Sequence, residues 1–186
     1  MRHIPYAIRI RGICMREQRG FSLIELIVTL IVLAIAASIA LPNLTQFIVR
    51  QRVSGQASEL LNALAYARSE ASKINNNVVV IPATNAASGW SNGWCVGPSS
   101  LADCNDAAVL KNYPAVAGNV SITSPYLQAT NKLTFRRDGT LLSGLSAQSF
   151  KITSERLEAS DNAARCITLN ALGKASMTKV NRDDGC

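Results

Sequence analysis

The apolar segment at residues 21–41 constrains the fold of this chain more than any other feature. It contains one charged residue, Glu25, and its other polar side chains are Ser22, Thr29 and Ser38. As an α-helix, this segment would extend roughly 31 Å, which is close to the thickness of the hydrocarbon core of a bilayer. The sequence therefore predicts a membrane-spanning helix, and the residues after this helix have the mixed composition of one ordinary domain.

Positive charge is concentrated in front of this segment. The chain has 19 Lys and Arg against 12 Asp and Glu, for a formal net charge of +7, and residues 1–20 hold five of the Arg and one Glu. The rest of the chain is therefore only mildly basic. Arginines before an apolar helix are typical of a cytoplasmic flank, so the charge favours a membrane orientation over a nucleic-acid surface. We expect a single-pass membrane protein whose globular head lies on the far side of the membrane, in the periplasm or the exterior.

Residues 1–20 are interpreted as a leader peptide outside the fold, because they show scattered Arg and no hydrophobic periodicity. Met15 is an alternative start, which would leave the short basic leader Met15 to Gly20. Two other interpretations are a simple signal anchor and a secretory signal peptide cut near Ala34 to Ala37. A conventional signal peptide would not explain Glu25, nor a helical pattern that continues beyond the cut.

The helical pattern continues past the apolar segment. Within residues 43–74, apolar residues recur largely at three- and four-residue spacings, which is typical of an amphipathic helix. These residues are Leu44, Phe47, Ile48, Ala57, Leu60, Leu61, Leu64, Ala67, Ala71 and Ile74. Asn75-Asn76-Asn77 is a stop signal, and Pro42 removes a backbone hydrogen bond and predicts a kink. We expect one long helix, with a membrane and assembly half at 21–42 and an amphipathic half at 43–74.

Residues 75–186 contain short β-prone runs separated by Gly, Pro, Asn and Asp. The predicted strands are residues 78–81, 94–96, 109–113, 120–123, 132–135, 150–153, 166–169 and 176–180. Arg137-Asp138-Gly139 and Ala171-Leu172-Gly173-Lys174 are turn signals, whereas residues 83–108 have the composition of a long loop. We therefore predict an α+β fold, in which a long N-terminal helix packs on the mostly antiparallel sheet of a β-rich head.

Four of the five cysteines, Cys95, Cys104, Cys166 and Cys186, come after the apolar segment. If the basic flank stays in the cytoplasm, these four lie in an oxidising compartment where disulfides persist. Three pairings are possible, and we favour Cys95 with Cys104 and Cys166 with Cys186, because short loops close easily. A zinc site is the competing interpretation, but the spacing is unusual for zinc and the residues after the leader contain no His.

Glu25 is an unusual residue near the start of a membrane helix, because carboxylates inside membranes are costly and usually functional. Cleavage after Gly20 would create an amine on Phe21, one helical turn from Glu25 and on the same face. The carboxylate of an incoming subunit could then meet the amine of the preceding subunit. Residues 20–26, Gly20-Phe21-Ser22-Leu23-Ile24-Glu25-Leu26, resemble the type IV prepilin signature.

This resemblance implies a prepilin peptidase that cuts after Gly20 and N-methylates Phe21. It also implies that Glu25 serves peptidase recognition and subunit docking, and that Pro42 bends the helix. Further motifs resemble the GspH/FimT family of type IV pilin-like proteins: Tyr66-Ala67-Arg68-Ser69-Glu70-Ala71, Gly89-Trp90, Gly93-Trp94, Phe135-Arg136-Arg137-Asp138-Gly139 and Gly173-Lys174. The resemblance implies the type IV pilin fold.

The family resemblance implies partners of three kinds: other pilins or pseudopilins in a filament, the prepilin peptidase, and the inner membrane before assembly. One branch of the family consists of minor pilins that prime type IV pilus assembly near the tip and end at the cell surface. These serve pilus biogenesis, twitching motility and adhesion. Another branch is the minor pseudopilin of type II secretion. The four cysteines and the C-terminal loop closed at Cys186 favour the pilus branch.

DNA binding in natural transformation is a further alternative, because some FimT-like pilins bind DNA through a Gly-Arg-x-Arg pattern near the C-terminus. The matching place here, Gly173-Lys174-Ala175-Ser176, lacks the second basic residue. Lys174, Lys179 and Arg182 could still form a small cluster that contacts phosphates. Asp183 and Asp184 adjoin this cluster and weaken its field, so DNA is not the favoured partner.

An enzyme is the least favoured class. The only His, His3, lies in the leader, and no acid, base and nucleophile occur at a recognisable spacing. Asp103 and Asp106 flank Cys104, but two acids without further ligands are more typical of turns than of a calcium site. Arg136-Arg137 is interpreted as an exposed hairpin end. We expect no cofactor and no metal.

Overall fold

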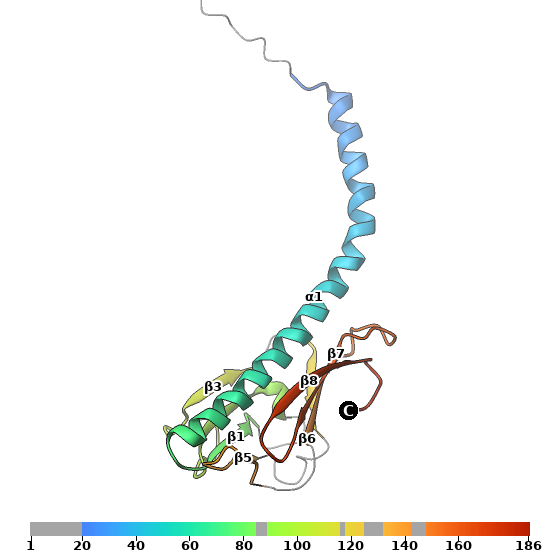
Figure 1. Cartoon of the computed structure of the whole chain (residues 1–186). Coiled ribbons are helices and arrows are strands. Elements are labelled where there is room, and N and C mark those ends of the chain that lie inside the picture. The colour runs from blue at the N-terminus through green and yellow to red at the C-terminus, as the bar shows by residue number, and fades with distance from the viewer. Residues whose placement is uncertain (1–19, 85–88, 116–117, 125–131, 143–147) are drawn as a thin grey trace, which may run out of the picture. The chain divides into compact units, whose positions relative to one another are not determined.

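The computed structural model describes residues 20–84, 89–115, 118–124, 132–142 and 148–186, apart from the side chains of residues 40–43. The chain divides into two compact units, residues 1–40 and 41–186. Helix α1 (Leu23–Lys73) begins in the first unit and ends in the second, and the described strands all belong to the second unit (Figure 1). The structure therefore confirms a long N-terminal helix followed by a β-rich head.

Both ends of α1 have local causes. At the start, the Ser22 hydroxyl oxygen accepts a hydrogen bond from the Glu25 backbone N–H at 3.3 Å, as an N-cap does. At the end, Asn75 adopts a φ of 51°, in the left-handed region, and the Asn76 N–H bonds to the Ala71 carbonyl. The asparagines therefore stop the helix, as predicted. The predicted kink at Pro42 falls on a residue whose side chain lies outside the described set, so it stays a prediction.

Within the described ranges, eight strands form two four-stranded antiparallel sheets. The first sheet contains β1 (Val78–Pro82), β2 (Gly93–Pro98), β3 (Lys111–Pro114) and β5 (Leu133–Phe135), in the order β3-β2-β1-β5. The second contains β4 (Val120–Thr123), β6 (Gln148–Ser154), β7 (Ala164–Leu169) and β8 (Ala175–Val180), in the order β4-β6-β7-β8. The predicted strands are confirmed, but they divide between two sheets instead of forming one.

The stretch expected to be a long loop is more structured than its composition indicates. Within residues 83–108, the described part includes the short 3-10 helix η1 (Gly89–Asn92) and strand β2. Trp90 in η1 is fully buried and packs edge-on against Phe150 of β6, with ring centroids 5.0 Å apart. An aromatic contact between η1 and the second sheet therefore fixes this segment.

The main core lies where the second half of α1 packs against both sheets. One face of the helix supplies aliphatic side chains, and each sheet supplies the inward-facing residues of its strands. The cluster includes Val53, Ala57, Leu60, Leu64, Ala67, Val80, Val96, Phe135, Phe150, Ile152 and Ile167. The amphipathic half predicted from the sequence is thus the helix on which the head folds.

The first sheet also has a smaller core on its other face. Val79, Ile81, Cys95 and Leu101 are buried there, with Cys104 packed against them. As a result, β1 is buried along its whole length, which suits its uniformly apolar sequence. The loop after β2 therefore works as a cover for this sheet.

Candidate assembly sites

The first candidate site is the start of α1. Gly20 and Phe21 precede the helix, and Phe21 is 83% exposed. A Cβ atom placed on Gly20 would meet nothing within 4 Å. This stretch is thus accessible, as a peptidase that cuts after Gly20 would require.

Glu25 has a structural role that the sequence analysis missed. Its backbone N–H caps onto Ser22, and the spacing Ser22-Leu23-Ile24-Glu25 is that of a capping box, which could have been found in the sequence. In a full capping box, the carboxylate would return to the Ser22 N–H, and the structure gives no such bond. Among the described residues, the Glu25 carboxylate has no ion-pair or hydrogen-bond partner. It is therefore available to a group outside the chain.

The rest of this unit is apolar and uncovered. Its large apolar side chains between residues 21 and 39 are 42% to 83% exposed. The two hydroxyl groups beyond Ser22 are satisfied locally, because Thr29 donates to the Leu26 carbonyl and Ser38 donates to the Ile35 carbonyl. Such a surface requires cover by lipid or by other helices.

Two segments of α1 together have the length and apolar composition to cross a membrane. Among the described residues, no single unbroken helix meets both requirements. Leu23–Ile39 and Leu44–Lys73 meet them only when they are taken together. The first of these segments corresponds to the apolar stretch that the sequence analysis assigned to the membrane.

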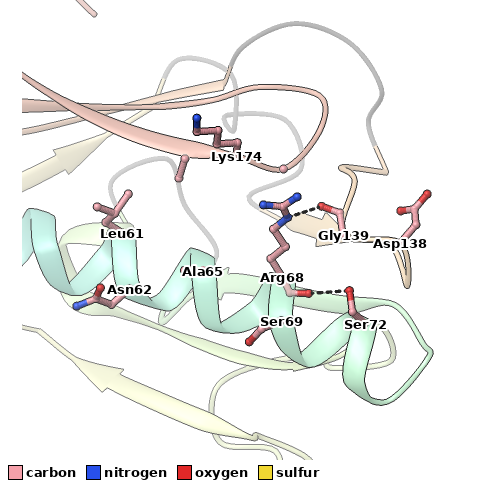
Figure 2. Close-up of a pocket in the computed structure, with 11 residues that line it drawn as sticks. Leu61, Asn62, Ala65, Arg68, Ser69, Ser72, Asp138, Gly139 and Lys174 are labelled. Carbon is pink, nitrogen blue, oxygen red and sulfur yellow. Dashed lines mark hydrogen bonds between the residues drawn. The ribbon is translucent and has the colours of Figure 1, made fainter.

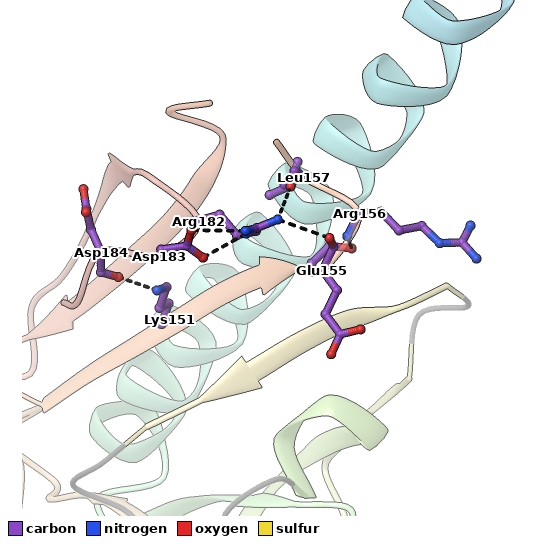
Figure 3. Close-up of polar contacts among 8 residues, drawn as sticks. Lys151, Glu155, Arg156, Leu157, Arg182, Asp183 and Asp184 are labelled. Carbon is purple, nitrogen blue, oxygen red and sulfur yellow. Dashed lines mark hydrogen bonds and ion pairs between the residues drawn. The ribbon is translucent and has the colours of Figure 1, made fainter. Parts of the chain in front are cut away.

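The structure contains both predicted disulfides. Cys95 pairs with Cys104, with Cα atoms 5.5 Å apart, and Cys166 pairs with Cys186, with Cα atoms 5.8 Å apart. The second bridge ties the end of the chain to β7. Lys151 of β6 also donates to the Asp184 carbonyl, so the C-terminal tail is held at two points (Figure 3).

Two of the three cations considered for DNA binding, Lys174 and Arg182, lie at opposite ends of one strand. Lys174 precedes the six-residue strand β8 and Arg182 comes after it, so about 20 Å of extended chain separates them. Arg182 donates to the Leu157 carbonyl at 2.9 Å and pairs with Asp183 at 2.9 Å (Figure 3). The hydrogen bond between the two side chains raises the pKa of Arg182 and lowers the pKa of Asp183. DNA contact stays a prediction, without the compact cluster that would favour it.

The two loop acids act in turns. The Asp103 carboxylate accepts a hydrogen bond from the Asn105 N–H at 2.7 Å, and the Asp106 carboxylate accepts one from the Ala108 N–H at 3.0 Å. Both contacts span two residues, as side chains that mimic a backbone turn do. The interpretation of these acids as turn formers is therefore confirmed.

The second candidate site is a hollow where three distant motifs meet. It has a volume of about 580 Å³ and lies between α1, the turn after β5 and the turn between β7 and β8 (Figure 2). Its lining residues are Leu61, Asn62, Ala65, Arg68, Ser69, Ser72, Asp138, Gly139, Gly173, Lys174 and Ala175. The motifs that contain Arg68, Asp138-Gly139 and Gly173-Lys174 are recognisable in the sequence, but their meeting in space is not.

The two turns beside this hollow are interlocked. Gly139 and Gly173 both adopt positive φ, 80° and 73°, and a Cβ atom on Gly173 would lie 2.1 Å from the Gly139 carbonyl oxygen. The Leu141 N–H bonds to the Ala171 carbonyl at 3.0 Å, and Arg68 Nε donates to the Gly139 carbonyl at 3.1 Å. Helix α1 and both sheets are therefore joined at this point.

Asp138 stabilises the first of these turns. Its carboxylate accepts hydrogen bonds from the Thr140 hydroxyl at 2.7 Å and from the Thr140 N–H at 2.9 Å. These bonds, helped by the charge of Arg136, lower the pKa of Asp138 below its usual value. The carboxylate thus stays ionised and bound to its own turn.

Comparison with known proteins identifies two matched regions. Residues 56–173 match the family model described as type II transport protein GspH, and residues 15–41 match the prokaryotic N-terminal methylation motif. No curated protein shows a significant match.

Two crystal structures of the type IV minor pilin FimU from Pseudomonas aeruginosa (strain PAO1) have a similar fold. One has a TM-score of 0.56 and covers 70% of this chain and 91% of that chain, and the other has a TM-score of 0.54 and covers 67% and 90%. Both are 23% identical in sequence, so they show the fold alone. The GspH model itself spans more than half of the chain. The chain therefore belongs to the GspH family, and it combines a prokaryotic N-terminal methylation motif with the type IV pilin fold.

Proposed function

We propose that this protein is a minor pilin, which a prepilin peptidase cuts between Gly20 and Phe21 and which then enters a type IV pilus near the tip. One observation carries the proposal: the uncovered apolar part of α1, residues 23–39, bears a single carboxylate, Glu25, which has no partner in the described chain. Before assembly, this helix lies in the inner membrane with the head in the periplasm. In the filament, helices of other subunits cover it.

The energetics of Glu25 support a docking role. A carboxylate near the centre of a membrane helix costs about 2.5–3.5 kcal/mol in insertion experiments, and less toward the interface. The cost is offset when the carboxylate pairs with an amine, such as the new terminus of Phe21 in a neighbouring subunit. Because the pair can form only after cleavage, processing and assembly are coupled.

The first test is the N-terminus of the full chain after membrane extraction, with and without co-expressed prepilin peptidase. We expect intact mass and N-terminal sequencing to give a peptidase-dependent start at N-methylated Phe21. An uncut chain, or a cut near Ala36, would instead support a signal anchor or a secreted domain and would refute the proposal.

The second test separates docking from helix capping. Glu25→Leu keeps the backbone N–H that caps onto Ser22 but removes the charge, whereas Ser22→Ala removes the cap acceptor and keeps the charge. We expect Glu25→Leu to insert in the membrane normally and to fall about tenfold in sheared filaments, equivalent to about 1.4 kcal/mol of docking energy. Ser22→Ala should enter filaments at near-normal levels.

Immunoblots of membrane and filament fractions measure both quantities. Normal incorporation of Glu25→Leu would refute the docking role. An equal loss in Ser22→Ala would assign the defect to the helix start instead of the charge.

A minor pseudopilin of a type II secretion system is the second candidate, and the family model that matches residues 56–173 favours it. The two disulfides, one of which closes the C-terminal tail at Cys186, support the pilus assignment. Deletion of the gene distinguishes the candidates. Loss of surface pili and twitching with normal protein secretion supports a minor pilin, and the opposite pattern supports a pseudopilin.

A further inference from the structure

The hollow beside α1 has short side chains on its helical side. Asn62, Ala65 and Ser69 are exposed, and together with Ser72 they lie along one side of the helix. Arg68 extends from this helix toward the two turns, and Lys174 lies on the opposite side of the hollow (Figure 2). The short residues leave space beside the Arg68 guanidinium group.

Arg68 is held in place but not neutralised. Its Nε donates to the Gly139 carbonyl at 3.1 Å, which fixes the plane of the guanidinium group. In the described part of the chain, its two terminal nitrogens have no hydrogen-bond or ion-pair partner. The two terminal nitrogens are therefore free to bind a ligand, and a fixed guanidinium fork suits a carboxylate in bidentate geometry.

Two other described arginines, Arg50 and Arg182, have carboxylate partners. Arg50 pairs with Asp161 at 2.5 Å, although the Arg50 side chain is 46% exposed, and Arg182 pairs with Asp183. Among the described residues that line the hollow, Asp138 is the only carboxylate, and it is occupied by Thr140. Figure 2 shows it on the far side of Gly139 from Arg68. The hollow therefore carries an excess of positive charge.

We propose that this hollow binds an acidic segment of a neighbouring filament subunit, whose carboxylate pairs with Arg68 and is also attracted by Lys174. The proposal rests on the proposed function as a filament subunit. Another subunit can reach the hollow because Asn62, Ala65 and Ser69 on its helical side are exposed. The volume accommodates one acidic side chain and its neighbours, whereas nucleic acid would require cations spread along a surface.

Site-specific cross-linking in assembled filaments tests this proposal. Ala65 is exposed and lines the hollow, so a photo-reactive amino acid at this position samples its contents. We expect mass spectrometry of sheared, irradiated filaments to identify a segment of another filament subunit that contains Asp or Glu. Cross-links only to lipid or nucleic acid, or to a segment without an acid, would overturn the proposal.

Charge variants make the test specific. Arg68→Gln should lower the cross-link yield about tenfold, and Lys174→Gln should lower it severalfold without disturbing the Gly139 bond. Lys179→Gln removes a cation from the same hairpin outside the hollow and should leave the yield unchanged. An unchanged yield in Lys174→Gln, which leaves the fold intact, would also overturn the proposal.

Filament fractions separate this inference from the function on which it rests. If the full chain is absent from sheared filaments, both proposals fail. If it is present but no acidic segment cross-links to position 65, only the docking proposal fails.

Discussion

The two halves of α1 both carry large apolar side chains but gain stability in different ways. In the second unit, Leu60 and Leu64 are almost completely buried against the sheets, whereas Leu30 in the first unit is 56% exposed. The head therefore carries its own core. The N-terminal segment has none in the described chain, and its apolar surface gains stability only from lipid or from other subunits.

This difference shows how one helix can serve two purposes. The half that packs in the head is amphipathic, because only one face is covered by the sheets. The half at residues 23–39 is apolar on all sides, as the proposed membrane and filament surroundings require. A change in the first half should therefore affect location and assembly, and a change in the second half should affect folding.

The most direct way to break this comparison uses the same substitution in both halves. Leu60→Ala creates a cavity in the main core and should lower the free energy of unfolding of the head by about 2–5 kcal/mol. Leu30→Ala should leave it unchanged. Urea unfolding of the full chain in detergent, followed by the fluorescence of the buried Trp90 and Trp94, measures both.

The measurement is specific because both tryptophans lie in the head core. A loss of head stability in Leu30→Ala comparable with that in Leu60→Ala would show that the two units fold together. The division of α1 into an assembly half and a folding half would then be wrong.

Two glycines, one in a turn and one in α1, should respond to the same substitution with opposite changes in stability. Gly173 has a φ of 73°, and an added Cβ atom would lie 2.1 Å from the Gly139 carbonyl oxygen. Gly173→Ala should therefore destabilise the head by about 1–3 kcal/mol. Gly55 lies within α1 with nothing within 4 Å of an added Cβ atom, so Gly55→Ala should stabilise the helix by up to about 1 kcal/mol.

Melting temperatures of the two variants should therefore move in opposite directions from that of the parent. A neutral Gly173→Ala would mean that the two turns can separate without cost. The hollow between them would then be less rigid than a docking site requires.

Sequence reasoning succeeded where the signal is local. The stop at Asn75, the short β runs and the turn at Asp138-Gly139 depend on neighbouring residues, and the structure contains all of them. The division into two sheets was missed, because it depends on which strands pair over long separations. For example, Val80 of β1 lies opposite Leu133 of β5.

The same distinction applies to the candidate sites. The residues from Gly20 to Glu25 are contiguous, so their pattern could be interpreted directly. The hollow unites Arg68, Gly139 and Gly173, which are far apart in sequence and meet only through the packing of α1 on both sheets. The residue types alone do not predict this contact, because an Arg on a helix and a Gly in a turn are common in folded domains.

The smallest expected effect concerns Asp138, whose lowered pKa makes one turn of the head sensitive to acid. A carboxylate with a lowered pKa stabilises the fold above its unfolded-state value of about 3.9, and this contribution is lost as the pH falls through the folded-state pKa. The difference in melting temperature between the parent and Asp138→Ala should thus shrink from pH 7 to pH values below about 4. Thr140→Val removes one donor and should reduce this pH-dependent part. A constant difference across this range would show that Asp138 acts only through turn geometry, without a contribution from its charge.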